Sequence, residues 1–137
     1  MEINLVRKND KFNFEAENSV GQTVELDANP AIGGEGKGFR PMEMLLVGLG
    51  GCSGIDMVNV LTKQKEPLDD INIKISATRK DDEVPAIFDV INIHFDLYGA
   101  LNMQKVERAL ELTFEKYCSV SNILSRSATI NFSYAIH

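Results

Sequence analysis

Two cysteines are the residues of this chain best suited to chemistry. Cys52 and Cys118 lie 66 positions apart in a chain of 137 residues. Where thiols are kept reduced, such a pair is buried packing, part of a metal site, or a redox pair. A disulfide requires Cα atoms within about 7 Å of each other. Sequence spacing alone leaves open whether the two sulfurs meet.

The segment around the first cysteine permits two interpretations. Residues 44–54 read MLLVGLGGCSG, which is close to the glycine fingerprint of a dinucleotide-binding turn, although Ser53 stands at the third glycine position. The alternative is one continuous helix from Pro41 to about Lys63, with Cys52 in its middle. No second βαβ unit follows Gly54, so we favour the helix. Because this helix is apolar almost all round, we expect it to be buried on all sides.

The flanking segments alternate between apolar and polar residues. Three short strands are predicted in the first 27 residues, followed by a glycine-rich loop at 28–40. Two further strands are predicted from Ile71 to Ala77 and from Ile91 to Leu97. The expected sheets are mostly antiparallel.

The second cysteine falls at the end of a predicted helix. Asn102 can cap this helix, whose apolar residues follow helical spacing as far as Tyr117. A short amphipathic turn follows Cys118, and a last strand runs from Ile130 to Ile136. A cysteine beside a helix N-terminus gains thiolate character from the unpaired amides. The order β-β-β-α-β-β-α-α-β predicts an α+β fold.

Charge and composition exclude several functional classes. The net charge is −6 and the pI is near 4.9, which argues against nucleic-acid partners and a polybasic membrane anchor. The longest run of apolar residues and glycine, Met44 to Cys52, is shorter than the roughly 20 residues of a membrane span. The N-terminus lacks a secretory signal. We therefore expect a cytoplasmic protein that does not engage the membrane.

No resident cofactor or metal is expected. The two histidines, His94 and His137, and the two cysteines lack the short spacings of zinc ligands.

Two motifs resemble a known family. Residues 40–54, RPMEMLLVGLGGCSG, continue into IDMVNVL, and residues 116–124 read KYCSVSNIL. With the order of elements between them, they resemble the OsmC/Ohr family of organic hydroperoxide reductases, and within it the OsmC-like, YhfA-like branch. The resemblance covers residues 1–137 as a single OsmC-like domain.

The resemblance implies a fold and a mechanism. Members are intertwined homodimers with curved antiparallel sheets around long central helices, and their active sites lie at the subunit interface. Carried over by position, Cys52 attacks the peroxide and becomes a sulfenic acid, and Cys118 resolves it as a disulfide. Ser119 replaces the proline that is common after the second cysteine.

The supporting residues of the family align less directly. Members place a glutamate after the helix proline, where it holds an arginine against the thiolate. Here Met42 occupies that position and the carboxylate is on Glu43, which can equally stabilise the first turn of the helix. Arg7 and Arg40 are the candidate arginines.

Two functional hypotheses result. The first is a thiol-dependent peroxidase for small apolar hydroperoxides, re-reduced by an external dithiol. The alternative is a non-enzymatic dimer that binds a small apolar ligand in the cleft between subunits.

Overall fold

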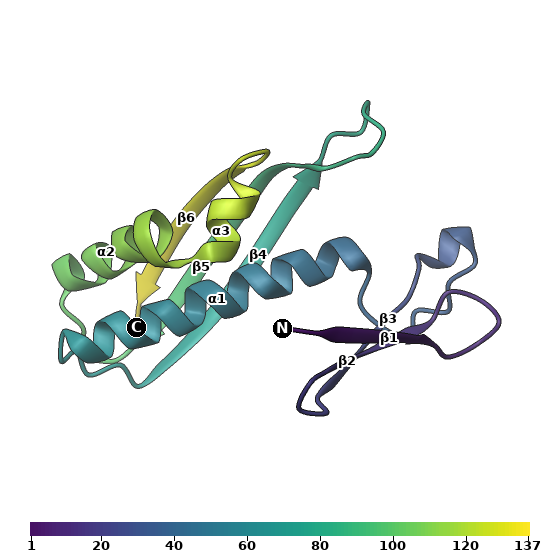
Figure 1. Ribbon diagram of the computed structural model, residues 1–137. Coiled ribbons are helices and arrows are strands. Elements are labelled where there is room, and N and C mark those ends of the chain that lie inside the picture. Colours follow the sequence, from purple (N-terminus) through teal and green to yellow (C-terminus); the bar gives the residue numbers. More distant parts are fainter. The chain divides into compact units, whose positions relative to one another are not determined.

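The computed structural model describes residues 1–137 and divides into two compact parts, Met1–Val47 and Gly48–His137 (Figure 1). The elements follow the predicted order of three strands, a long helix, two strands, a helical segment and a last strand. The expected α+β fold is therefore confirmed.

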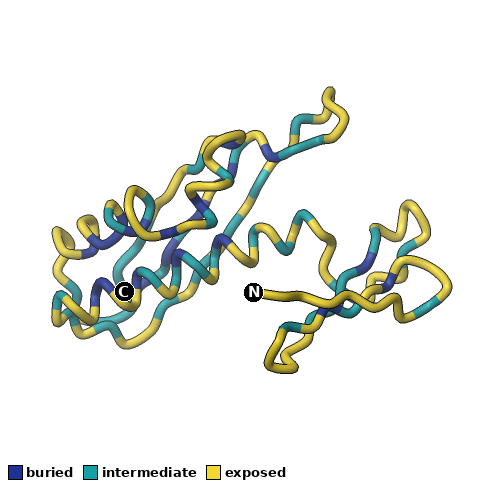
Figure 2. The backbone as a smooth tube through the Cα atoms, viewed as in Figure 1, coloured by how far each residue is buried: buried dark blue, intermediate teal, exposed yellow.

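The N-terminal part is built on a three-stranded antiparallel sheet. Its strands are β1 (Ile3–Arg7), β2 (Phe14–Asn18) and β3 (Thr23–Leu26), paired in chain order. Alternation places Leu5, Ala16 and Val24 in register across the sheet. Most residues of this sheet are exposed (Figure 2).

The glycine-rich loop after β3 is organised by one carboxylate. Asp27 is buried and accepts hydrogen bonds from the backbone N–H groups of Ala28, Glu35 and Lys37, at 2.8, 3.2 and 3.1 Å. These bonds hold the pKa of Asp27 below its usual value. The loop also contains a short 3₁₀ turn, η1 (Pro30–Ile32).

Helix α1 (Pro41–Lys63) is continuous through all the glycines of its middle. A dinucleotide-binding turn needs a break between strand and helix at this point, so that alternative is wrong. One face of α1 is buried and comprises Leu49, Ser53, Met57, Val60 and Leu61. The prediction of burial on all sides is therefore not met within one chain, because Val47, Ile55 and Val58 remain exposed.

The length and composition of α1 also satisfy the criteria for a membrane span. Its most apolar 18-residue window has a mean hydropathy of 1.6, and 33% of that window is buried in the structure. The core helix of a soluble protein passes the same test, so this is only a weak indication of a membrane segment.

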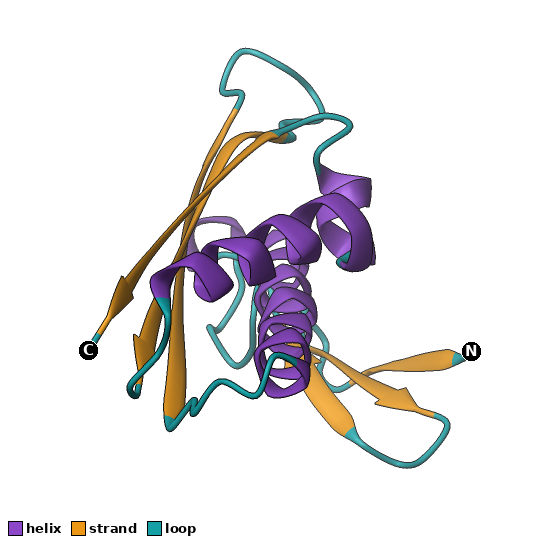
Figure 3. Ribbon diagram, turned by 90° about the vertical axis from the view of Figure 1, so that its left-hand side faces the viewer, coloured by secondary structure: helices purple, strands orange, loops and turns teal.

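The C-terminal part contains a second three-stranded sheet in the order β4-β5-β6, with its helices on one face (Figure 3). β4 (Asp70–Arg79) and β5 (Phe88–Tyr98) are antiparallel, whereas β6 (Thr129–Ile136) runs parallel to β5. The parallel pair departs from an all-antiparallel arrangement because a helical crossover separates β5 from β6.

Glycines let α1 approach this sheet closely. A Cβ on Gly54 would lie 2.8 Å from Cδ1 of Ile73, and one on Gly50 would lie 3.0 Å from Cδ1 of Ile75. The small residues therefore place the middle of α1, with Cys52, directly over β4. Close packing of this kind offsets the cost of about 0.8–1 kcal/mol for each helical glycine.

The helical crossover consists of α2 (Met103–Leu112), the π-helical turn η2 (Thr113–Tyr117) and α3 (Ser119–Leu124). Asn102 caps α2, as predicted, by accepting a hydrogen bond from the N–H of Lys105 at 3.2 Å. The carboxylate of Glu66, just after α1, accepts from the N–H of Asn102 and pairs with Lys105, both at 2.7 Å. These contacts tie the start of α2 to the end of α1.

Removing the cap should weaken this junction. Asn102→Ala is expected to lower the free energy of unfolding by about 1 kcal/mol, the usual cost of a lost N-cap acceptor. Asn102→Ser keeps an acceptor and should remain close to the wild type. Urea denaturation of the three proteins checks the expectation, and an alanine variant as stable as the wild type would contradict it.

Candidate active site

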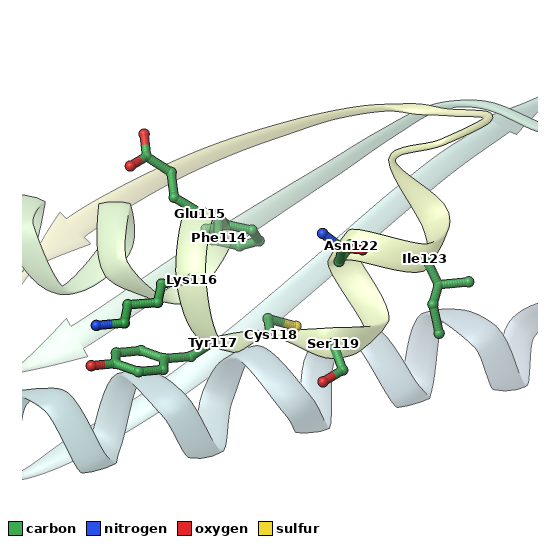
Figure 4. Close-up of a pocket in the computed structure, with 8 residues that line it drawn as sticks. All are labelled: Phe114, Glu115, Lys116, Tyr117, Cys118, Ser119, Asn122 and Ile123. Atoms are coloured by element: carbon green, nitrogen blue, oxygen red, sulfur yellow. The ribbon is translucent and has the colours of Figure 1, made fainter.

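The structure brings the two cysteines together. Cys52 lies in the middle of α1, and Cys118 lies between η2 and α3, beside the ribbon of α1 (Figure 4). Their sulfurs are within 4.8 Å of each other, and both are free thiols. Sequence spacing left open whether the two sulfurs meet. The packing of α3 and η2 near α1 brings them together.

Local hydrogen bonds fix the position of Cys118. Its N–H donates to the carbonyl of Thr113 at 2.8 Å and so closes the π-helical turn. Its carbonyl accepts from the hydroxyl of Ser121 at 2.9 Å and from the N–H of Asn122 at 3.1 Å. The backbone that carries this thiol is therefore anchored on both sides.

The thiol of Cys118 serves as the N-cap of α3. Its sulfur accepts a hydrogen bond from the N–H of Ser121 at 3.4 Å, which places it at a helix N-terminus as predicted. The expected gain in thiolate character is outweighed, because burial and the neighbouring Cys52 raise the pKa of Cys118 above its ordinary value. Only 3% of this residue is exposed.

Cys52 is more accessible than Cys118. It is partly exposed, whereas Cys118 is buried. The hydroxyl of its neighbour Ser53 donates to the carbonyl of Leu49 at 2.7 Å, so this buried hydroxyl is satisfied within the helix. Of the two sulfurs, Cys52 is thus the one that a molecule from solvent reaches more easily.

Asp56 is a third member of the site. A carboxylate oxygen of this residue lies within 4.8 Å of both sulfurs. Its Oδ2 atom is buried and has no hydrogen-bond partner, and burial raises the pKa of the carboxyl. No role was predicted for Asp56 from the sequence, although it lies one helical turn after Cys52 in an apolar helix. That spacing was the available signal.

A cavity of about 260 Å³ opens beside Cys118. Apolar and polar side chains both contribute to its wall (Figure 4). The lining residues are Phe114, Glu115, Lys116, Tyr117, Cys118, Ser119, Asn122 and Ile123. The cavity gives a small molecule room next to the second cysteine.

The other predicted site residues lie in the N-terminal part and contact one another or the adjacent loop. Arg7 donates to the backbone carbonyls of Asp10 and Lys11. The carboxylate of Glu43 accepts from the N–H of Arg40 at 2.9 Å and faces its guanidinium at 3.7 Å. Glu43 therefore caps the first turn of α1, and a role for Arg7, Arg40 or Glu43 at the thiols stays a prediction.

The arrangement suits thiol chemistry. Two thiols within 4.8 Å of each other can be joined by an oxidant after their side chains rotate, since the disulfide bond is about 2.05 Å long. The two sulfurs and the carboxylate oxygen are also atoms that a metal ion could use as ligands.

Comparison with known proteins finds relatives that match most of the chain. The model of the family described as OsmC-like protein matches residues 34–133. YhfA of Escherichia coli K12 is 37% identical over 124 residues, which cover 90% of this chain and 89% of YhfA.

Solved structures share the fold. A hypothetical protein from Aquifex aeolicus is 31% identical, with a TM-score of 0.85 over 99% of this chain and 95% of that one. OsmC of Legionella pneumophila, described as an organic hydroperoxide resistance protein, is 19% identical, with a TM-score of 0.75 over 98% of this chain and 95% of that one. The family match and the identity to YhfA lead to one conclusion: this chain belongs to the OsmC-like protein family.

Proposed function

We propose that this protein is a thiol-dependent peroxidase that reduces organic hydroperoxides. The observation that carries the proposal is the approach of the Cys52 and Cys118 sulfurs to within 4.8 Å. The Legionella protein named as an organic hydroperoxide resistance protein has the same fold, which agrees with this substrate class. The apolar residues of α1 around Cys52 favour an alkyl hydroperoxide over hydrogen peroxide.

The first step oxidises Cys52. Its thiolate attacks the terminal oxygen of the hydroperoxide, the O–O bond breaks, and the departing alkoxide takes up a proton to become an alcohol. Cys52 is left as a sulfenic acid. We assign this step to Cys52 because it is partly exposed, whereas Cys118 is buried.

The second step joins the two cysteines. The thiolate of Cys118 attacks the sulfur of the sulfenic acid, and the hydroxide that leaves is protonated to water. The product is a Cys52–Cys118 disulfide, which an external dithiol reduces through a mixed disulfide. Because this cycle depends on a supply of reduced thiols, we place the protein in the cytoplasm.

Thiol counting tests the cycle. After treatment of the reduced protein with micromolar cumene hydroperoxide, mass spectrometry is expected to find one disulfide and a mass lower by two hydrogen atoms. Cys118→Ser should stop at a Cys52 sulfenic acid that dimedone traps, while Cys52→Ser should keep Cys118 reduced. A wild-type protein that retains both thiols would exclude the peroxidase and favour the ligand-binding alternative.

The second step should depend on pH. Because the pKa of Cys118 is raised, its thiolate is a minor species at neutral pH and increases about tenfold per pH unit below that pKa. The rate of conversion of sulfenic acid to disulfide is therefore expected to rise steeply from about pH 6 to 8. Stopped-flow mixing measures this rate, with Cys118→Ser as the control for the first step. A rate of disulfide formation that does not change between about pH 6 and 8 would contradict the raised pKa of Cys118.

We also propose that the protein is a homodimer. One face of α1 exposes Val47, Gly51, Ile55 and Val58, and Ile55 alone is 72% exposed. An exposed apolar face in the middle of a long helix is typical of a surface that packs against a partner. A second copy of the chain presents the same self-complementary helix face, as a two-fold symmetric interface requires.

A charge on this face should separate the subunits. Ile55→Lys is expected to convert the dimer to a monomer in sedimentation velocity, because a buried interface does not accommodate an unpaired ammonium. Val84→Lys, on a fully exposed loop residue, is the matched control and should stay dimeric. A monomeric wild type, or an Ile55→Lys protein that stays dimeric, would refute this interface.

A further inference from the structure

Three atoms capable of binding a metal surround one point in the C-terminal part. They are the sulfurs of Cys52 and Cys118 and a carboxylate oxygen of Asp56, all within 4.8 Å of one another. For a triangle with sides no longer than 4.8 Å, one point lies within 4.8 Å divided by the square root of three, about 2.8 Å, of every corner. Zinc binds sulfur at about 2.3 Å and carboxylate oxygen at about 2.0–2.2 Å. A contraction of less than 1 Å therefore completes the coordination.

The backbone already holds these ligands in place. Cys52 and Asp56 lie one turn apart on the same helix, so their side chains project from neighbouring positions of one face. Cys118 enters from the junction of η2 and α3, where hydrogen bonds to Thr113 and Ser121 anchor it. The site thus combines a rigid pair of ligands with a third from a separate element.

The three groups of this cluster attract a cation when they are deprotonated. All three groups are anionic when deprotonated, and Oδ2 of Asp56 is buried without a hydrogen-bond partner. A buried carboxylate oxygen without a partner destabilises the folded protein. A divalent ion bound among the three groups would neutralise their charges and give the carboxylate of Asp56 a partner.

We propose that Cys52, Asp56 and Cys118 bind a thiophilic divalent cation of the zinc type in the reduced protein. Two thiolates select against magnesium and calcium, which prefer oxygen ligands. Three protein ligands leave the fourth tetrahedral position open to water. Asp56 supplies the third ligand of this site, whereas the two cysteines and two histidines alone lack the spacing of a zinc site.

The site and the proposed peroxidase share both sulfurs, but metal binding does not rest on the peroxidase cycle. A disulfide between Cys52 and Cys118 removes two of the three ligands. If the protein is oxidised by a hydroperoxide, the ion must therefore leave, whereas an unreactive protein keeps it.

Metal titration of the full-length, metal-free protein, reduced with a phosphine, tests this site. Addition of Co²⁺ is expected to produce sulfur-to-metal charge-transfer bands in the near ultraviolet at one ion per chain, and Zn²⁺ should abolish them. Asp56→Asn is expected to weaken Zn²⁺ binding by at least about tenfold. Cys52→Ser should remove the charge-transfer bands or reduce them strongly.

The control addresses the exposed histidines. His94 and His137 both lie beside Asp96, with His137 at 2.7 Å, and such surface groups can bind zinc weakly. The double variant His94→Ala, His137→Ala should bind Zn²⁺ as the wild type does. The inference is overturned if no charge-transfer band forms, or if folded Asp56→Asn and Cys52→Ser bind Zn²⁺ as tightly as the wild type.

These measurements need no peroxide, so the two proposals can fail separately. If the protein binds Zn²⁺ but retains its thiols after treatment with cumene hydroperoxide, only the peroxidase proposal is refuted. If the protein forms the disulfide but shows no Co²⁺ charge-transfer band, only the proposal of a metal site is refuted.

Discussion

The approach of α3 and η2 to α1 is the constraint on which the candidate site depends. A Cβ on Gly48 of α1 would lie 4.0 Å from Val120 of α3, which is an ordinary van der Waals contact. This contact lies one turn before Cys52 on α1 and two residues after Cys118 in the chain. The π-helical turn Thr113–Tyr117 follows α2, and Cys118 comes directly after it, beside the ribbon of α1 (Figure 4). Without this packing, the two thiols would be unrelated residues of two helices.

The site consists of two thiols and a carboxyl, and its chemistry depends on how easily these three groups lose their protons. The pKa values of Cys118 and Asp56 are both raised, chiefly because burial disfavours their charged forms. A peroxidase needs a thiolate, so the partly exposed Cys52 is better suited to the first attack than the buried Cys118. The same three groups would become a ligand set when a cation displaces their protons. The proposed redox chemistry and the proposed metal binding would thus both follow from one arrangement of Cys52, Asp56 and Cys118.

Helix α1 has two different faces. Its glycines at 50 and 54 allow close contact with Ile75 and Ile73 of β4, while Ile55 on another side remains exposed. The helix therefore carries apolar residues beyond those that a single chain buries. A second copy packed on the exposed face would account for the lack of a polar side, which is the feature that set this helix apart in the sequence.

The sequence by itself determined the elements and the family. Hydrophobic periodicity and capping residues are local signals, so they located α1, the alternating strands and the Asn102 cap, and two cysteine motifs identified the OsmC-like family. Other features depended on tertiary structure. One such feature is the cluster of Cys52 and Asp56 with Cys118, since Cys118 comes from a distant segment of the chain. Another is the parallel pairing of β6 with β5, which are also far apart in the sequence. The cap that Glu43 forms at the start of α1 is a local contact with Arg40, three residues earlier, and the sequence already offered this role. Periodicity reports which face of an element is apolar, and only packing decides which faces meet.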